Sequence, residues 1–105
     1  MIQKGYDLLG LAQKAGQVKS GEAAAEEAIN KGKAKLVLVA EDASLRTRDR
    51  FISLAKYKKI PWLEIGEKLR LGIAIGKSPR SVVTVTEKNF AKRLFELFGG
   101  EEEDF

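Results

Sequence analysis

The stretch Gly32-Lys-Ala-Lys-Leu-Val-Leu-Val-Ala-Glu-Asp-Ala-Ser44 decides the fold class. Its centre, Leu36 to Ala40, is an unbroken apolar run with two β-branched residues, which is typical of a strand buried on both faces. Gly32 can end a preceding helix because glycine adopts a positive φ without strain. Ser44 can cap a following helix by accepting a hydrogen bond from an early helical N–H. This order predicts the middle of an α/β domain, where ligands bind at the carboxyl ends of strands.

Apolar residues recur at helical or strand spacing on both sides of this stretch. The periodicity predicts helices over about residues 4–15, 20–31, 44–58, 67–75 and 86–98, and strands over residues 36–40, 60–65 and 82–85. Residues 17–19 are too few for more than a minor strand or a linker. Leu11 in the first helix, and Leu69 and Ile73 in the fourth, are expected to face the core.

The alternation of these elements favours the α/β class, as a three-layer α/β/α sandwich around a central mixed four-stranded sheet. Ser20 and Thr86 are expected to cap the second and the last helix through their side-chain oxygens. Residues 1–98 are expected to form a single domain. Residues 99–105 contain four acids and no base and are expected to form an acidic flexible tail.

The composition excludes several kinds of active site. The chain has no histidine and no cysteine, which rules out disulfides, thiolate metal sites and Ser-His-Asp or Cys-His mechanisms. We therefore predict no enzymatic activity, no metal and no cofactor. The first residues lack the apolar core of a signal peptide, and no apolar run approaches the ~20 residues that span a membrane. We expect a cytoplasmic monomer that does not contact membranes.

Basic residues dominate the folded part of the chain. Although the whole chain has a net charge of +4, residues 1–98 contain all 19 basic residues and 11 of the 15 acidic ones. Their net charge is thus +8. A basic folded body favours nucleic acid or another anionic surface as the partner. A lysine-rich solvated surface is the alternative explanation.

Two segments resemble a known family. The first runs from Lys19-Ser-Gly-Glu22 through the stretch that ends at Ser44, and the second is Leu71-Gly-Ile-Ala-Ile-Gly-Lys77. Their order and spacing resemble the ribosomal kink-turn RNA-binding family, which includes the archaeal seven-Ae and eukaryotic thirty-e ribosomal proteins and small bacterial relatives. The resemblance covers most of the chain. It implies an α/β/α sandwich that binds structured RNA, most naturally ribosomal RNA.

The resemblance also implies where RNA binds. In the family, RNA lies against the start of the second helix and the loop before the last strand. Helix N-terminal N–H groups attract phosphate oxygens, and Gly21 allows close approach of the backbone. Basic side chains would neutralise phosphates, while Ser20, Gly21 and Glu22 would shape the pocket. The candidate RNA-binding residues are Lys19, Ser20, Gly21, Glu22, Lys31, Lys33, Lys77 and Arg80.

The chain departs from the family pattern at the reader positions. Where kink-turn readers carry an asparagine, a glutamate and a lysine, this chain has Ala23, Ala24 and Glu27. Alanine forms no hydrogen bond with a base edge, and each such bond carries ~1–3 kcal/mol of discrimination. A carboxylate near phosphate is repulsive. We therefore predict RNA binding without standard kink-turn specificity.

Two other functions fit parts of the sequence. A protein-interaction module that has kept the fold but lost specific RNA recognition would explain the altered reader positions. A receiver-like domain would use Asp42, at the end of the central strand, as a phosphate acceptor or acid. No acidic pair on an earlier strand accompanies Asp42 to hold Mg²⁺, and acids at strand ends are often caps.

Overall fold

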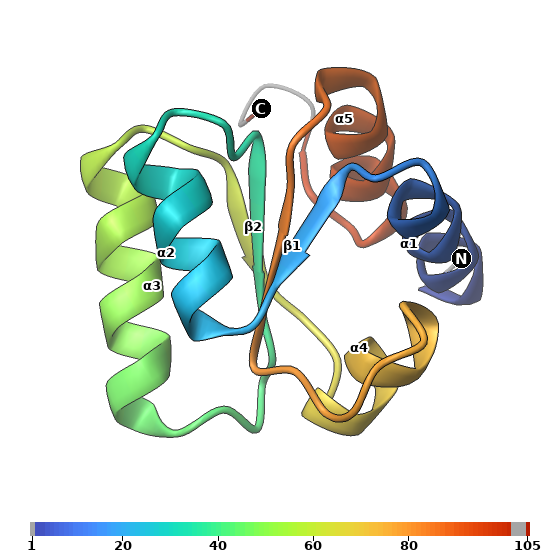
Figure 1. The fold of residues 1–105 in the computed structure, drawn as a ribbon, viewed down its shortest axis with the longest axis horizontal. Coiled ribbons are helices and arrows are strands. Elements are labelled where there is room, and N and C mark those ends of the chain that lie inside the picture. The colour runs from blue at the N-terminus through green and yellow to red at the C-terminus, as the bar shows by residue number, and fades with distance from the viewer. Residues whose placement is uncertain (1, 102–104) are drawn as a thin grey trace.

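A computed structural model describes residues 2–101 and residue 105. Over these residues the chain forms helices and strands in alternation (Figure 1). The elements are α1 (Ile2–Lys14), β1 (Val18–Ser20), α2 (Glu22–Asn30), β2 (Leu36–Val39), α3 (Leu45–Tyr57), β3 (Trp62–Glu64), α4 (Lys68–Ala74), β4 (Val82–Val85) and α5 (Lys88–Leu97).

The sheet is mixed, and its strand order is β1-β4-β2-β3. Strand β2 pairs in parallel with β3, while β4 runs antiparallel to both β1 and β2. Helices α2 and α3 cover one face of this sheet, and α1, α4 and α5 cover the other (Figure 1). The predicted three-layer sandwich with a mixed four-stranded sheet is confirmed.

The core lies around the two central strands, β2 and β4, whose residues are all buried. Thr84 of β4 is fully buried, and its hydroxyl donates to the carbonyl oxygen of Lys19 over 2.8 Å. This bond helps to tie β1 to β4, with Val18 opposite Val85 and Ser20 opposite Val83. The segment over residues 17–19, expected to be a minor strand or a linker, thus contributes its last two residues to a short edge strand, because β4 supplies their backbone partners.

Of the three predicted helix caps, one is confirmed and two are wrong. Ser44 caps α3, since its Oγ accepts from the Thr47 N–H at 3.2 Å. Ser20 ends β1 instead, and Gly21 precedes α2 without a side-chain cap. Glu87, not Thr86, caps α5 by accepting from the N–H groups of Asn89 and Phe90. These two bonds lower the pKa of Glu87 because they favour its charged form.

The apolar stripes predicted for two helices are partly wrong. Leu11, Leu69 and Ile73 are exposed, at 56%, 60% and 59%. Helix α4 instead buries Leu71 in the core and Gly72 against the chain that follows the helix. A Cβ on Gly72 would lie 2.2 Å from the carbonyl oxygen of Ser78. Leu69 and Ile73 are thereby turned toward solvent.

The predicted acidic tail lies partly outside the described residues, at positions 102–104. Its flexibility stays a prediction. Within the described part, the Phe105 ring lies 5.5 Å from the ring of Phe95 on α5. No helix over the described residues is long and apolar enough to cross a membrane.

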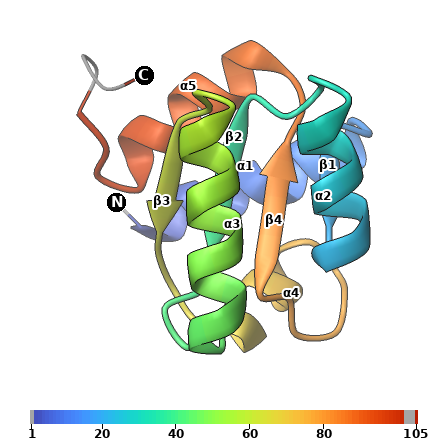
Figure 2. The ribbon, with the colours of Figure 1, turned by 90° about the vertical axis from the view of Figure 1, so that its left-hand side faces the viewer.

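The strand directions bring several chain segments to one end of the sheet. Strands β1, β2 and β3 run the same way and β4 runs the opposite way. Their carboxyl ends therefore meet the amino end of β4, beside the starts of α2 and α3 and the turn that leads from α4 into β4 (Figure 2). This is the end of the sheet at which ligands bind in α/β folds.

Candidate nucleic-acid interface

Gly21 forms the junction between the edge strand and helix α2. Its φ of 87° and ψ of 160° place it in a region that essentially only glycine adopts. Its N–H donates to the Val82 carbonyl over 3.0 Å, and its carbonyl accepts from the Ala25 N–H over 2.9 Å. A Cβ at Gly21 would meet nothing within 4 Å. The backbone turn, and not crowding, therefore requires glycine.

Arg80 lies across a small cavity from this junction. The cavity is about 260 Å³ and is lined by Ser20, Gly21, Glu22, Pro79, Arg80 and Ser81. The Nε of Arg80 donates to the Ser20 hydroxyl over 3.1 Å, and its Nη1 donates to the Ser78 hydroxyl over 2.7 Å and to the Ser78 carbonyl over 3.1 Å. These partners are neutral, and Nη2 forms no bond within the described residues. The guanidinium is thus held in place with its charge uncompensated.

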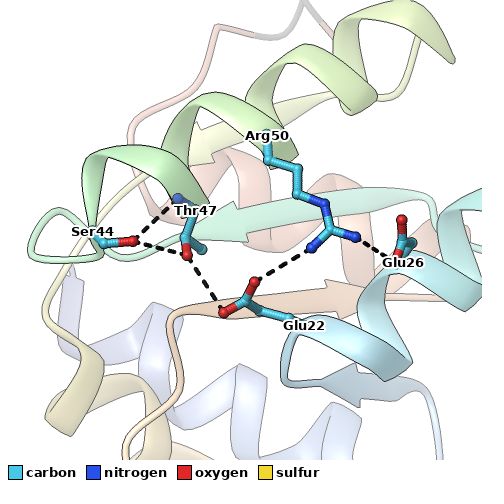
Figure 3. Close-up of polar contacts among 5 residues, drawn as sticks. All are labelled: Glu22, Glu26, Ser44, Thr47 and Arg50. Atoms are coloured by element: carbon cyan, nitrogen blue, oxygen red, sulfur yellow. Dashed lines mark hydrogen bonds and ion pairs between the residues drawn. The ribbon is translucent and has the colours of Figure 1, made fainter.

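Glu22 is held by helix α3 (Figure 3). One oxygen of its carboxylate lies 3.5 Å from Arg50 Nη1, and the other accepts a 3.4 Å hydrogen bond from the Thr47 hydroxyl. Arg50 also pairs with Glu26 one turn along α2. Ser44 donates to Thr47 over 3.0 Å and so extends the contacts to the α3 cap. This network fixes the start of α2 against α3 and neutralises part of its acidic charge.

The altered reader positions lie on the exposed side of α2. Ala23, Ala24 and Glu27 are all exposed. The Glu27 carboxylate lies 3.3 Å from the Lys31 amino group, as an i, i+4 pair of opposite charges on one helix. The solvent-facing surface next to the cavity is therefore formed by methyl groups and a paired carboxylate.

The structure brings together only some of the candidate residues. Ser20, Gly21, Glu22 and Arg80 line one cavity, and Lys19 precedes them on β1. Lys31 and Lys33 follow the other end of α2, whose nine residues span about 13 Å.

Lys77 does not line the cavity either. The backbone N–H of Lys77 donates to the Gly72 carbonyl, whereas the N–H of Arg80 donates to the Lys68 carbonyl. Lys77 is therefore held about one helical turn along α4 from Arg80, outside the cavity.

Several residues of this surface were not predicted from the sequence. Ser78 positions Arg80, and Thr47 and Arg50 position Glu22. Local spacing alone predicts that Arg50 is solvated or paired with Asp49, whereas the structure pairs it with Glu22 and Glu26. One sequence feature could have indicated a contact between these helices. Glu22 and Glu26 are spaced i, i+4 on one helix, and Arg46 and Arg50 have the same spacing on another helix that covers the same face of the sheet.

Asp42 has a structural partner that accounts for its position. Its carboxylate accepts a 2.8 Å hydrogen bond from the backbone N–H of Lys68, at the start of α4. Within the described residues, no group of three acids, histidines or cysteines is placed to hold a metal ion. The receiver-like alternative therefore gains no support from the arrangement around Asp42.

Comparison with known proteins identifies the family. A model of the ribosomal protein L7Ae/L30e/S12e/Gadd45 family matches residues 3–95. The chain belongs to this family. The resemblance is thus confirmed, and the family match spans all of the elements except the first residue of α1 and the last two of α5.

Individual members of the family are similar over nearly the whole chain. The RNA-binding protein YlxQ of Bacillus subtilis is 41% identical over 92 residues, which cover 88% of this chain and 92% of that protein. The large ribosomal subunit protein eL8 of Thermoplasma volcanium is 29% identical, covering 89% of this chain and 78% of its own.

Two solved structures share the fold. A protein of unknown function from Bacillus halodurans superposes with a TM-score of 0.87 and 34% identity, and covers 90% of this chain and 96% of its own. The 15.5 kDa RNA-binding protein of Giardia lamblia superposes with a TM-score of 0.79 and 26% identity, and covers 95% of this chain and 86% of its own.

Proposed function

We propose that the protein is a small non-catalytic RNA-binding protein of ribosomal type, which acts in the cytoplasm on structured RNA. Its relatives include a protein named as RNA-binding and a large ribosomal subunit protein. The observation that carries the proposal is Arg80, which is positioned by Ser20 and Ser78 and forms no ion pair within the described residues. A fixed guanidinium beside an uncapped helix start is a site for a phosphate oxygen.

The charge around the cavity supports a polyanionic ligand. Glu22 and Glu26 would repel phosphates, but both pair with Arg50. Glu27 pairs with Lys31. These pairings reduce the repulsion that the acids of α2 exert on phosphates, and Arg80 adds a positive charge that has no ion-pair partner within the described residues. RNA phosphates would dock here, and kinked RNA suits this compact pocket because it is read through shape and unstacked bases.

Specificity is expected to differ from that of standard kink-turn readers. Ala23 and Ala24 are exposed beside the cavity and offer no polar group to a base edge. Each lost bidentate contact removes about 1–3 kcal/mol of discrimination. The protein should therefore distinguish a bent RNA from a straight duplex more strongly than it distinguishes one base from another within the bend.

The test is an RNA titration at several salt concentrations with Arg80→Ala. RNA affinity should fall. The slope of log affinity against log salt concentration, which we call the salt slope, should decrease by the amount that about one phosphate contact contributes. Arg80→Lys keeps the charge but loses the planar guanidinium whose N–H groups reach both Ser20 and Ser78. The salt slope should therefore stay the same, while RNA affinity should fall. Arg93→Ala on α5 is a matched control, since Arg93 is exposed and pairs only with its neighbour Glu96 within the described residues. Unchanged affinity and slope for Arg80→Ala would contradict the proposal.

The exposed alanines favour one other function, a protein-interaction module that has kept the fold. Methyl groups at Ala23 and Ala24 suit a protein surface better than a base edge. Purification from cells with and without nuclease separates the two functions. A protein partner that stays bound after nuclease treatment, with no retained RNA, would favour the alternative.

A further inference from the structure

Lysines gather at the end of the sheet opposite Gly21 and Arg80. The α2–β2 loop carries Lys33 and Lys35, and the α3–β3 loop carries Lys58 and Lys59. The parallel pairing of β2 with β3 joins these loops, because the Val37 N–H donates to the Pro61 carbonyl over 3.0 Å. We call Lys33, Lys35, Lys58 and Lys59 the lysine surface.

The lysine surface is exposed and retains its charge. All four side chains are exposed, and none forms an ion pair within the described residues. Lys35, Lys58 and Lys59 line one hollow of about 300 Å³, together with backbone and apolar groups of neighbouring residues and Phe105. Glu101 shares an adjacent hollow with Lys59. Four positive charges that form no ion pair within the described part of the chain thus lie on two neighbouring loops and suit an anion.

Lys59 has a backbone conformation that disfavours lysine. Its φ is 58°, and it is the one non-glycine residue with positive φ among the described residues. Each of the other four helices is followed by a glycine in a positive-φ conformation, namely Gly16, Gly32, Gly76 and Gly99. Side chains other than glycine are strained in this region. A lysine stands at the end of α3 despite that strain, which indicates that its side chain has a use outside the fold.

We infer that the lysine surface binds the phosphate backbone of a second segment of the same RNA. This inference rests on the proposed function. Lysines act as point charges that neutralise phosphates without reading sequence. The protein measures 29 × 28 × 23 Å, so a flanking duplex on the order of ten base pairs is as long as the molecule. An RNA held at the Arg80 cavity can thus reach the other end of the sheet if it carries such an extension.

Two RNAs test this inference. The short RNA contains only a kinked element, and the long RNA adds a flanking duplex of about ten base pairs. Lys59→Gly removes the charge and relieves the backbone strain, so the stability measured by urea unfolding should stay equal or rise. Binding of the short RNA should not change. Binding of the long RNA should weaken, with a salt slope lower by about 0.9 for each lysine removed.

Additional variants complete the test. Lys35→Gln combined with Lys58→Gln and Lys59→Gly should lower the slope for the long RNA by about three times as much as Lys59→Gly alone. Lys4→Gln is the charge-matched control, because Lys4 is an exposed lysine on α1. It should leave both RNAs unaffected.

The outcomes separate this inference from the proposed function. If Lys59→Gly leaves the long RNA unaffected while Arg80→Ala weakens both RNAs, the inference is overturned and the proposed function stands. An equal loss for both RNAs would also overturn it. Polyglutamate serves as an acidic polypeptide probe. If Lys59→Gly weakens polyglutamate binding but not long-RNA binding, the surface belongs to an acidic protein, and the inference fails.

Discussion

Two residues with positive φ, Gly21 and Lys59, lie at opposite ends of the sheet. The physical reason why each residue type occupies its position differs between the two. Gly21 has a conformation that essentially only glycine adopts, and open space surrounds its missing Cβ. Lys59 has a left-handed conformation in which glycine would be less strained. At Gly21 the backbone determines the residue, whereas at Lys59 the side chain is kept at a cost to the backbone.

Gly21→Ala is expected to destabilise the protein by about 1–3 kcal/mol, because alanine must be forced into the conformation of Gly21. The substitution causes no direct clash, so its whole cost is conformational. Urea unfolding followed by circular dichroism measures this loss. A second readout is RNA affinity, which should also fall because a relaxed Gly21 would shift Ser20 away from Arg80.

Gly16→Ala, at the end of α1, is the control for Gly21→Ala. Gly16 has a φ of 74° with open space around it, so its replacement should reduce stability and leave RNA affinity unchanged. A variant Gly21→Ala as stable as the parent would show that the junction is not constrained as described.

At the scale of elements, the pairing of α2 with α3 determines the charge of the candidate interface. Arg50 of α3 contacts both Glu22 and Glu26 of α2, and the Thr47 hydroxyl adds a hydrogen bond to Glu22. All three charged side chains are partly exposed. The ion pairs therefore contribute little to stability, and their main effect is on the electrostatic potential near the cavity.

Arg50→Ala is expected to weaken RNA binding while changing the free energy of unfolding by less than about 1 kcal/mol. The substitution leaves two carboxylates unpaired at the start of α2, where they repel phosphates. Adding Glu22→Gln and Glu26→Gln to Arg50→Ala should restore affinity. Fluorescence anisotropy titrations compare the three proteins. A triple variant that binds as weakly as Arg50→Ala would mean that Arg50 contacts the RNA itself.

At the scale of the whole molecule, charge is distributed unevenly along the chain and around the fold. Residues 1–98 have a net charge of +8, which four acids at positions 101–104 reduce to +4. Arg80 lies at one end of the sheet and the lysine surface at the other, as two separate basic groups. A long-range attraction for RNA follows from the net charge, while the orientation of the RNA would follow from the two groups.

Replacing Glu101, Glu102 and Glu103 by glutamine and Asp104 by asparagine is expected to accelerate association with RNA. The change raises the net charge from +4 to +8 and keeps Phe105, whose ring contacts Phe95. Electrostatic steering depends on net charge and is screened by salt. Stopped-flow association rates of the variant should therefore be higher than those of the parent protein at low salt, and the two should converge near 1 M salt. Equal rates at low salt would contradict this prediction.

Much of the fold could be predicted because the deciding signals are local. The all-apolar run Leu36–Val39 indicated a buried central strand, and Ser44 indicated the α3 cap. The errors occurred where tertiary contacts outweighed local pattern. Ile73 fits a helical stripe but faces solvent, because α4 turns Leu71, on the other side of the helix, into the core.

The candidate site could be predicted only in part. Gly21 and Arg80 were expected on one rim, and they line the same cavity. Lys33 was grouped with them but follows the far end of α2. Sequence separation does not reveal on which end of a sheet a loop lies unless the strand directions are known.

The sequence by itself determined the order of helices and strands, the buried strands, the basic charge and the absence of histidine and cysteine chemistry. These properties depend on residue type and short-range spacing. Only the tertiary structure decided that Arg80 meets Ser20, that Arg50 pairs with two acids of α2, and that the lysines of two loops form one surface. Each of these contacts depends on strand order and direction, which arise from pairing between segments distant in the chain.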